Sequence, residues 1–596
     1  MGRRAPQLCL LSAFVALALP QGLQASAGFI RAYGGKFVDE ECKPFLASGV
    51  NTWELMEVAS GAVESKKVQL SNGQETDVVQ WTLATAAANS LTVMRMFAHG
   101  VHPDFPLQIA PGEYNEKAFK ALDYILDEAS KLGIRVIMTL GDNWVGADSK
   151  PIYSSWSISA EESEDPDAFF SDPKCRQDYK NHIKKMVNRK NTRNKRLYKD
   201  DPTIFAWDLM NEPRCDCFPE EFPPPVSMTS CRPECAHKLQ AWIVEMSTYL
   251  KEQDPKHMVT VGEEGFWGPG AKRESANPGN GWASLTGQNF TANMNLPTID
   301  FAAVHLWPDN WEHWDLAFLD TWILEHAADA RAMGKPFMIE EFGKQVHMET
   351  PVAQANITSV RTPFYRKVYK AYLDSIAAGD DLVSGLVFWQ WGYTPYVDRS
   401  HFEGCLHCFA IQVTPSDAIF TNIIHPSAEK ALKTMRSAPA APGCTPVPEK
   451  QRTRLSLASA DLGSSGGLSS MVDALRPKAS GQSASLPADA KLSESSAKPG
   501  KIIPAVAGDK GPLGMVQDPV RDVQVTDLDN ADLPADALRS MSTSKGPKRT
   551  RLMDHSHQRP VHSLKAQPAS AVKIAGAAAA TANTAGIRRQ ARRFVA

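Results

Sequence analysis

The sequence predicts an α/β fold, a (β/α)8 TIM barrel of eight parallel strands with a disordered C-terminal extension. Between residues 28 and 436, short apolar runs alternate with longer segments of helical periodicity. Eight such runs are the number that a closed parallel barrel requires. No glycine-rich phosphate loop follows the first apolar run, which disfavours an open doubly wound sheet. The runs cover residues 49–56, 91–97, 135–140, 203–210, 258–261, 301–306, 336–339 and 385–391.

Amphipathic segments between these runs supply the outer helices that such a barrel needs. In residues 116–132 the apolar side chains recur on one helical face, and residues 238–252 and 363–378 show similar spacing. We therefore predict helices over these three ranges. We expect residues 28–436 to form a single barrel domain.

The composition allows a large buried core and gives no sign of a polyanionic partner. The chain has 596 residues, of which 43% are hydrophobic and 22% charged, and its net charge is -3. We therefore expect no nucleic-acid partner.

Residues 1–27 have the layout of a secretory signal peptide. Two arginines precede an apolar run over residues 8–19, and the small residues Ala25 and Ala27 stand just before Gly28. The apolar run is too short for a membrane span. We therefore expect a secreted, extracellular protein of the cell wall or extracellular matrix, without a membrane-spanning helix.

Removal of the signal peptide leaves nine of the ten cysteines, and secretion favours disulfides. The odd count leaves one thiol free or paired between chains, and the spacing does not give the connectivity. The four cysteines in residues 215–235 are also compatible with a zinc site, although their irregular spacing favours disulfides. We expect no metal and no cofactor. Asn289 and Asn356 begin N-glycosylation patterns. The nine cysteines are Cys42, Cys175, Cys215, Cys217, Cys231, Cys235, Cys405, Cys408 and Cys444.

Residues 437–596 differ in composition from the rest of the chain. They are rich in Ala, Ser, Pro and Gly, with almost no aromatic residues and no sustained periodicity. Such a segment cannot bury enough apolar surface to offset its chain entropy, so we predict disorder. Its basic clusters at 548–551 and 588–593 fit either a solvated tail without a partner or an electrostatic tether to anionic polysaccharide or a membrane surface.

The predicted strands end in polar and aromatic residues that meet at one mouth of the barrel. In this fold the loops after the strands enclose the large concavity, so functional groups come from several strand ends. Two carboxylates, Glu212 and Glu341, belong to nearly opposite strands. The residues around them are Arg95, Asn143, Trp144, Asn211, Glu264, Trp267, His305, Trp307 and Trp389.

Two carboxyl groups facing each other across an indole-lined pocket suit glycoside hydrolysis. One must stay protonated to donate to the leaving oxygen, while the other stays ionised to attack or stabilise the sugar cation. Indole faces stack on pyranose rings, and Arg95 beside a carboxylate would lower the pKa of that carboxylate. No two histidines share a spacing suited to metal ligation, so a metallohydrolase is the weaker interpretation.

Three motifs carry a resemblance to a known family. They are Trp-Asp-Leu-Met-Asn-Glu-Pro-Arg-Cys at residues 207–215, Val-His-Leu-Trp-Pro-Asp at 304–309 and Glu-Glu-Phe-Gly-Lys at 340–344. They resemble glycoside hydrolase family 5, and specifically its endo-β-1,4-mannanases of plant and fungal type. The resemblance covers residues 28–436 and none of the tail. The Asn-Glu-Pro triplet alone marks a broad clan of barrel glycosidases, whereas the full set is far more specific.

The resemblance implies that Glu212 is the general acid/base and Glu341 the nucleophile of a retaining mechanism. Glu341 immediately precedes the Phe-Gly of the motif, and strand alternation points Glu340 away from the pocket. In retaining enzymes the two carboxyl groups lie about 5–5.5 Å apart.

The resemblance also implies roles for the supporting residues. Arg95 would keep the nucleophile ionised, and Asn211 would hold the sugar 2-hydroxyl near it. His305 would orient the acid/base or the substrate. Trp389 would form the floor of the subsite before the scissile bond.

Three features depart from the family pattern. Trp307 stands where family members usually have a tyrosine that donates a hydrogen bond to the nucleophile, so an indole N–H would replace that donor. Asp208 stands where glutamate is common. The cysteine-rich insertion at residues 215–235 directly follows the acid/base and is expected to form a wall of the cleft.

Together these inferences predict a secreted, monomeric endo-β-1,4-mannanase whose partner is β-mannan polysaccharide: mannan, galactomannan or glucomannan. A β-1,4-glucanase or β-mannosidase on the same scaffold is the first alternative, because loops set the sugar at each subsite. The second alternative is a non-catalytic polysaccharide-binding protein of the cell wall. Trp307 and the insertion would be consistent with this alternative, because both depart from the family pattern.

Overall fold

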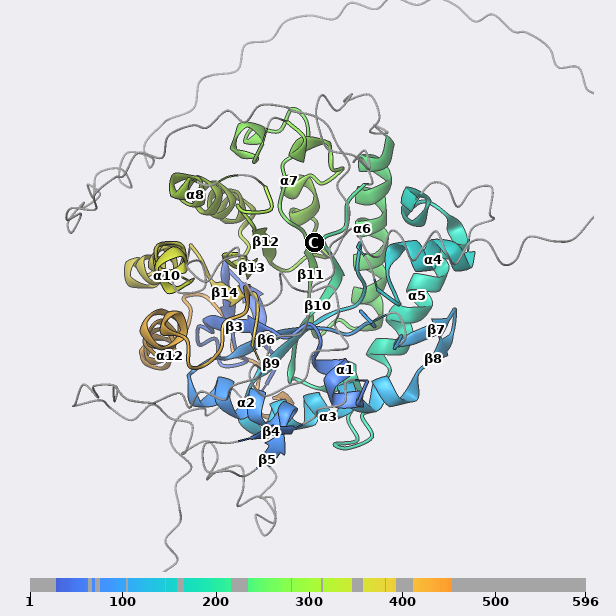
Figure 1. Ribbon diagram of the computed structural model, residues 1–596, viewed down its shortest axis with the longest axis horizontal. Helices are drawn as coiled ribbons and strands as arrows, with labels where there is room; N and C mark the ends of the chain where they lie inside the picture. The colour runs from blue at the N-terminus through green and yellow to red at the C-terminus, as the bar shows by residue number, and fades with distance from the viewer. Residues whose placement is uncertain are drawn as a thin grey trace, which may run out of the picture. The chain divides into compact units, whose positions relative to one another are not determined.

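Eight parallel strands form the barrel that the sequence predicts (Figure 1). The computed structural model describes residues 28–452 apart from 63–66, 70–74, 103–104, 145, 158–165, 216–233, 280, 312, 314, 346–356, 381 and 393–410. The strand order is β11-β10-β9-β6-β3-β14-β13-β12. The strands are β3 (Ala47–Asn51), β6 (Val93–Phe97), β9 (Arg135–Thr139), β10 (Ile204–Asn211), β11 (Met258–Gly262), β12 (Ala302–Leu306), β13 (Phe337–Phe342) and β14 (Gly385–Phe388).

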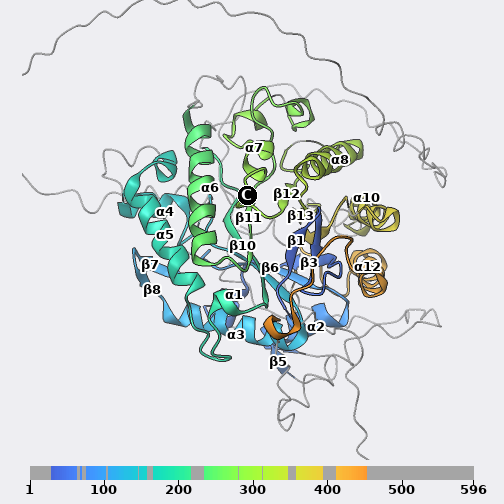
Figure 2. The same ribbon diagram turned by 180° about the vertical axis from the view of Figure 1, so that it is seen from behind.

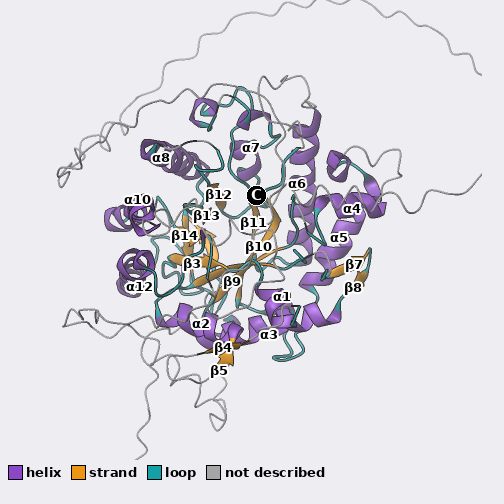
Figure 3. Cartoon of the chain, viewed as in Figure 1, coloured by secondary structure: helices purple, strands orange, loops and turns teal. Residues whose placement is uncertain are grey.

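A backbone hydrogen bond beside the two edge strands nearly closes the barrel. The N–H of Asp300, just before β12, donates to the carbonyl of Val259 in β11 at 2.8 Å. Figure 3 shows the strands as an inner group with the helices outside it. Each of the eight predicted runs overlaps one strand. The first run extends too far, because β3 ends at Asn51 and a helix begins at Leu55.

The three predicted helices are confirmed as α3 (Glu116–Leu132), α6 (Glu234–Gln253) and α10 (Ile357–Ala378). Helix α3 begins where the Asn115 side chain accepts hydrogen bonds from two backbone N–H groups, and it ends at Gly133 with φ 72°. The other helices are α1 (Leu55–Ser60), α2 (Val78–Ala88), α4 (Lys150–Ser157), α5 (Pro173–Val187), α7 (Phe290–Met294), α8 (Leu316–Met333) and α12 (His425–Ser437).

Short hairpins and single-turn helices lie outside the eight-stranded sheet. Antiparallel hairpins are formed by β1 (Arg31–Tyr33) with β2 (Lys36–Val38), β4 (Lys67–Gln69) with β5 (Glu75–Asp77), and β7 (Gln108–Ala110) with β8 (Glu113–Tyr114). The described single-turn helices are η1 (Pro166–Phe170), η2 (Tyr198–Asp200), η4 (Glu274–Ala276), η5 (Ala283–Leu285), η7 (Phe420–Ile424) and η8 (Glu449–Gln451).

Apolar side chains fill the base of the barrel, where the strands begin. Phe205 and Phe301, near the starts of their strands, pack against Phe37 of the β1–β2 hairpin with ring centroids 5.1 and 5.3 Å away. A larger apolar cluster lies between the strands and the helices. Because the base is filled, the carboxyl ends of the strands at the opposite mouth are the place for a site.

The chain continues beyond the predicted domain end at residue 436. Residues 438–452, here called the strap, lie on the base of the barrel, where Cys444 forms a disulfide with Cys42. Figure 2 shows the orange strap beside the blue N-terminal hairpin on this face. The remainder of the predicted extension, residues 453–596, lies outside the described residues.

The second disulfide among the described residues joins Cys215 to Cys235, and Cys175 is a buried free thiol. This bond contradicts a four-thiolate zinc site, because two of the four sulfurs are bonded to each other. The other predicted cysteines lie outside the described residues. So does Asn356, whereas Asn289 is half-buried and caps helix α7. No helix in the described ranges is long and apolar enough to cross a membrane.

Candidate active site

Most of the predicted site residues meet at the mouth of the barrel where the strands end. Glu212 and Glu341 lie within reach of the same histidine ring, and polar or aromatic side chains from other strand ends surround them. The contributing residues are Arg95 on β6, Asn143 and Trp144 after β9, Asn211 on β10, Glu264 after β11, His305 on β12, Trp307 after β12 and Trp389 after β14.

Glu212 has a left-handed backbone conformation, with φ 46°. Such a conformation is unfavourable for a residue other than glycine and persists where the surroundings fix it. Here the N–H of Glu212 donates to the carbonyl of Gly262 at 2.7 Å. The turn presents the carboxylate to two donors. Nδ1 of His305 lies 2.6 Å from Oε1, and Nε1 of Trp144 donates to Oε2 at 2.7 Å.

Glu341 is held by different partners. Nη1 of Arg95 donates to its Oε1 at 2.5 Å, and Nε1 of Trp307 donates to its Oε2 at 3.3 Å. The indole of Trp307 therefore supplies the hydrogen bond that the family resemblance leads us to expect from a phenol. Nδ1 of His305 lies 3.6 Å from Oε2, so one imidazole borders both carboxylates.

The Arg95 guanidinium is fully buried and uses all of its N–H groups. Besides Glu341, Nη1 donates to Oδ1 of Asn51 at 3.1 Å. Nη2 donates to Oδ2 of Asp208 and to Oδ1 of Asn211, both at 2.9 Å, and Nε donates to Oδ2 of Asp208 at 3.3 Å. Asp208, the shorter carboxylate in the motif, therefore still reaches Arg95 and holds it in place.

Glu340 does not point away from the pocket, and that prediction is wrong. Its side chain is fully buried, with Oε1 3.5 Å from Nε of Arg95. Strand alternation fails here because the pairing of β12 with β13 shifts after Val304, which faces Ile339. Neither carboxyl oxygen of Glu340 has a hydrogen-bond partner among the described residues. Burial raises the pKa of Glu340 to about 8, so this carboxyl is protonated at neutral pH.

The two carboxylates and His305 titrate together. Burial lowers the pKa of His305, but the charges of Glu341 and Glu212 outweigh burial and raise it to about 9. Burial raises the pKa of Glu212, yet the hydrogen bond and charge of His305 bring it below the usual value. In Glu341 burial outweighs the opposing charges of His305 and Arg95, and the pKa is raised. In the free protein the proton of the Glu212–His305 pair therefore rests on His305.

A second layer of contacts fixes Trp144. The guanidinium of Arg214 lies 4.2 Å from the centre of its ring, and Nη1 of Arg214 pairs with Glu264 at 3.1 Å. Oδ1 of Asn143 accepts a hydrogen bond from the N–H of Arg214 at 3.3 Å. Nδ2 of Asn143 is buried without a partner in the described part of the chain.

Ligand atoms of Glu212, His305 and Glu341 lie within 4.8 Å of one another, as in a metal site. The same holds for Asp167 with Cys215 and Cys235, but those two sulfurs are already bonded to each other. In the first cluster Nδ1 of His305 is committed to Glu212 by a hydrogen bond. This arrangement suits proton transfer between the residues better than metal ligation.

Comparison with known proteins decides the family. The profile described as "GH family 5 beta-mannosidase-like" matches residues 27–403. This chain belongs to glycoside hydrolase family 5. Glu212, Glu341 and the residues around them all lie inside the matched region.

The relatives of this family 5 hydrolase include plant enzymes. Mannan endo-1,4-beta-mannosidase 1 of Oryza sativa subsp. japonica is 37% identical over 381 residues, which cover 62% of this chain and 80% of that protein. Mannan endo-1,4-beta-mannosidase 1 of Solanum lycopersicum is 32% identical over 437 residues, or 72% and 98% of the two chains. The endo-1,4-beta-mannanase of Rhizomucor miehei shares the fold, with TM-score 0.52, 24% identity and coverage of 68% and 99%.

Trp267 is the predicted site residue that this hydrolase does not bring to the mouth of the barrel. Its ring is fully buried and stacks on His326 with centroids 3.9 Å apart. Its Nε1 donates to Asp329 of helix α8 at 2.9 Å. The position of Trp267 therefore supports a packing role instead of contact with a sugar.

The hydrolase also uses residues that the sequence analysis overlooked. Asn51 receives a hydrogen bond from Arg95, and Oγ1 of Thr139 donates to Asp208 at 2.8 Å. Asp142 accepts a hydrogen bond from Nδ2 of Asn211 at 3.0 Å. Asn51 and Thr139 each end a barrel strand, so a complete inventory of polar residues at strand ends would have found them.

Proposed function

We propose that this family 5 hydrolase is a secreted, monomeric, retaining endo-β-1,4-mannanase acting on mannan, galactomannan and glucomannan. The observation that carries the proposal is the pair Glu212 and Glu341, whose closest carboxylate oxygens lie within 4.8 Å. Inverting enzymes keep their carboxyl groups about 6.5–9.5 Å apart to admit water, so this closeness favours double displacement. The names of the plant relatives support β-mannan as the substrate.

In the first step Glu341 attacks the anomeric carbon while Glu212 protonates the leaving glycosidic oxygen. Nδ1 of His305 lies 2.6 Å from Oε1 of Glu212, so the proton on the imidazole passes to the carboxylate over a single hydrogen bond. The positive charge of Arg95 stabilises the ionised carboxylate of Glu341 until Glu341 forms the glycosyl ester.

In the second step water attacks the same carbon. Glu212, now ionised, takes a proton from that water, and the bond to Glu341 breaks. The regenerated carboxylate of Glu341 returns to the N–H groups of Arg95 and Trp307. In this proposal Asn211 binds the 2-hydroxyl beside the nucleophile, which is supported by the hydrogen bond that its Oδ1 accepts from the same guanidinium.

A substrate panel tests the proposal. Purified protein is expected to release reducing ends from galactomannan and glucomannan but not from carboxymethylcellulose. The opposite preference indicates a β-1,4-glucanase and ends the mannanase assignment. Proton NMR of the first products is expected to show the β anomer before mutarotation, whereas an α anomer excludes retention.

Variants of the two glutamates separate catalysis from mere binding. We expect Glu341→Ala and Glu212→Ala each to lose about 100-fold or more of kcat while still binding galactomannan in a pull-down. Glu263→Gln is the control, since this buried carboxyl contacts Asn293 and lies outside the catalytic pair. If binding persists and neither alanine variant changes turnover on any β-glycan, the chain is a polysaccharide-binding protein.

A β-mannosidase is the second candidate, because the matching profile is described as beta-mannosidase-like. The two enzymes differ in their products. An endo-acting enzyme lowers the viscosity of galactomannan early and gives mixed oligosaccharides. An exo-acting enzyme gives mannose with little early change in viscosity.

A further inference from the structure

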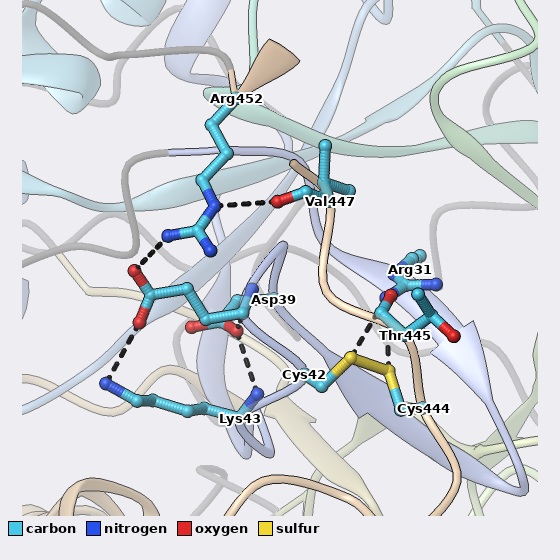
Figure 4. Close-up of a disulfide and its surroundings, with 9 residues drawn as sticks. Arg31, Asp39, Cys42, Lys43, Cys444, Thr445, Val447 and Arg452 are labelled. Atoms are coloured by element: carbon cyan, nitrogen blue, oxygen red, sulfur yellow. Dashed lines mark hydrogen bonds and ion pairs between the residues drawn. A yellow bond between two sulfur atoms is a disulfide. The ribbon is translucent and has the colours of Figure 1, made fainter. Parts of the chain in front are cut away.

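The disulfide between Cys42 and Cys444 joins the β1–β2 hairpin region to the strap at the base of the barrel (Figure 4). The two cysteines are separated by 402 residues of sequence. Backbone bonds accompany the disulfide: the N–H of Ala441 donates to the carbonyl of Cys42 at 2.7 Å, and that of Val447 to Glu40 at 2.8 Å. The junction therefore combines one covalent link with polar contacts.

The two sulfurs of this disulfide differ in access. Cys42 is fully buried, whereas Cys444 is partly exposed. A thiolate attacks one sulfur along the line of the S–S bond and expels the other. Only the Cys444 residue reaches the surface, so in this proposal its sulfur is attacked and Cys42 is the leaving group.

A cation stands beside both sulfurs. Nη2 of Arg31 lies 3.2 Å from Sγ of Cys42 and 3.1 Å from Sγ of Cys444, and the carbonyl of Thr445 accepts its hydrogen bond at 2.8 Å. Figure 4 shows the guanidinium against the disulfide. A neighbouring arginine lowers the pKa of a thiol, and a thiolate of lower pKa leaves faster.

The second disulfide has different surroundings. Cys215 and Cys235 are both buried, and a carboxylate oxygen of Asp167 lies within 4.8 Å of their sulfurs. Nζ of Lys150 pairs with Asp167 at 3.1 Å and balances its charge, so burial, which blocks attack, is what sets this disulfide apart. The chain thus holds an internal control for the Cys42–Cys444 bond.

We propose that Cys42–Cys444 is a thiol–disulfide exchange site whose substrate is a dithiol reductant. One thiolate of the reductant bonds to Sγ of Cys444, and the electron pair of the S–S bond leaves on Cys42 as a thiolate beside Arg31. The second thiol of the reductant then displaces Cys444 and closes a disulfide within the reductant. Two electrons and two protons pass from the dithiol to the protein, which gains two thiols.

Opening of this site loosens the strap. A chain loop of 402 residues is no longer closed by a covalent bond, so the unfolded state gains entropy. The polar contacts remain, including that of Arg452 with Glu41 at 2.7 Å. Glu212 and Glu341 lie at the other mouth of the barrel, so turnover at low temperature is unchanged. The proposal does not depend on the substrate of the hydrolase.

The test is timed reduction of the full-length protein with dithiothreitol, followed by alkylation and mass-spectrometric mapping of Cys42, Cys444, Cys215 and Cys235. We expect the first pair to be alkylated well before the second. Arg31→Gln is expected to slow reduction of the first pair about three- to tenfold, and Arg31→Lys to restore part of the rate. Opening of the first pair alone is expected to lower Tm by about 5 °C.

Two results overturn the proposal. Equal rates for the two disulfides in the wild-type protein show that Cys42–Cys444 is not a preferred site. An unchanged rate in Arg31→Gln, with a melting curve that confirms folding, shows that the cation has no part in it. Because every readout is chemical or thermal, failure of the mannanase assignment leaves the test intact.

Discussion

At the scale of single residues, Trp307 is an aromatic hydrogen-bond donor to one of the two paired carboxylates. Its Nε1 donates to Oε2 of Glu341 over 3.3 Å. A Cβ on Gly343 would lie 2.8 Å from the carbonyl oxygen of Trp389 and 2.9 Å from the Trp307 ring. Both neighbours therefore require glycine two residues after Glu341.

Trp307→Phe removes the donor and keeps an aromatic ring. Since a hydrogen bond to a carboxylate contributes about 1.5–3 kcal/mol, we expect kcat/KM to fall about tenfold for this long bond. Loss of the donor raises the pKa of Glu341, so the acid limb of the kcat/KM profile moves to higher pH. Trp307→Tyr, which restores a donor, is expected to recover activity. Equal pH profiles for Trp307→Phe and wild type contradict this role.

Glu340 makes the stability of the protein depend on pH. Its pKa is about 8 in the folded protein against 4.5 for an ordinary glutamate, so the folded state keeps a proton that the unfolded chain loses. The stability is complete below pH 4.5 and declines as the pH rises towards 8. At pH 7 the loss is on the order of 3 kcal/mol.

Glu340→Gln, which is always neutral, is expected to avoid this decline. Its Tm at about pH 7.5 rises above that of the wild type, while the two proteins melt alike near pH 4.5. Thermal melts across this range measure the effect. A difference in Tm that is constant with pH shows that Glu340 does not titrate between these limits.

At the scale of the elements, strand β11 passes very close to Arg95. A Cβ on Gly262 would lie 2.8 Å from Oδ2 of Asp208 and 2.9 Å from Nη2 of Arg95. We expect Gly262→Ala to displace this ion pair and lower kcat about 10- to 100-fold, because small misplacements of catalytic groups have effects of this size. Gly268→Ala, whose nearest neighbour would lie at 3.2 Å, is the control with a smaller effect. Equal kcat in both variants contradicts the prediction.

The periodicity of the sequence predicted the elements well, because strands buried on both faces and amphipathic helices leave strong patterns. The direction of individual side chains was harder to predict. Glu340 turned inwards because the β12–β13 pairing shifts by one residue, which no local pattern reveals. Trp267 was misplaced because its loop folds back onto helix α8, a contact set by tertiary packing.

At the scale of the whole molecule, the strap was missed because its proline-rich, weakly apolar composition resembles a disordered tail. Ala441 is buried in it, whereas most of its other described residues are exposed or half-exposed. The strap is held by a disulfide and backbone hydrogen bonds, and not by an apolar core of its own. Spacing of cysteines in the sequence cannot reveal such a pairing.

Truncation measures what the strap contributes. A chain ending at Arg452 is expected to keep the Tm and kcat of the full chain. A chain ending at Arg436 loses the Cys42–Cys444 bond and is expected to melt several degrees lower, since closing so long a loop stabilises by several kcal/mol. Equal melting temperatures for the two shortened chains show that the strap adds nothing to stability.

The strap also decides which way the hydrolase faces when it is held by its C-terminal side. Arg452 leaves the barrel at the base, where the strands begin, while Glu212 and Glu341 occupy the mouth where they end. A surface, resin or fusion partner attached after Arg452 therefore lies on the side of the barrel base. The mouth of the barrel, with Glu212 and Glu341, remains turned away from the attachment point and open to large molecules in solution.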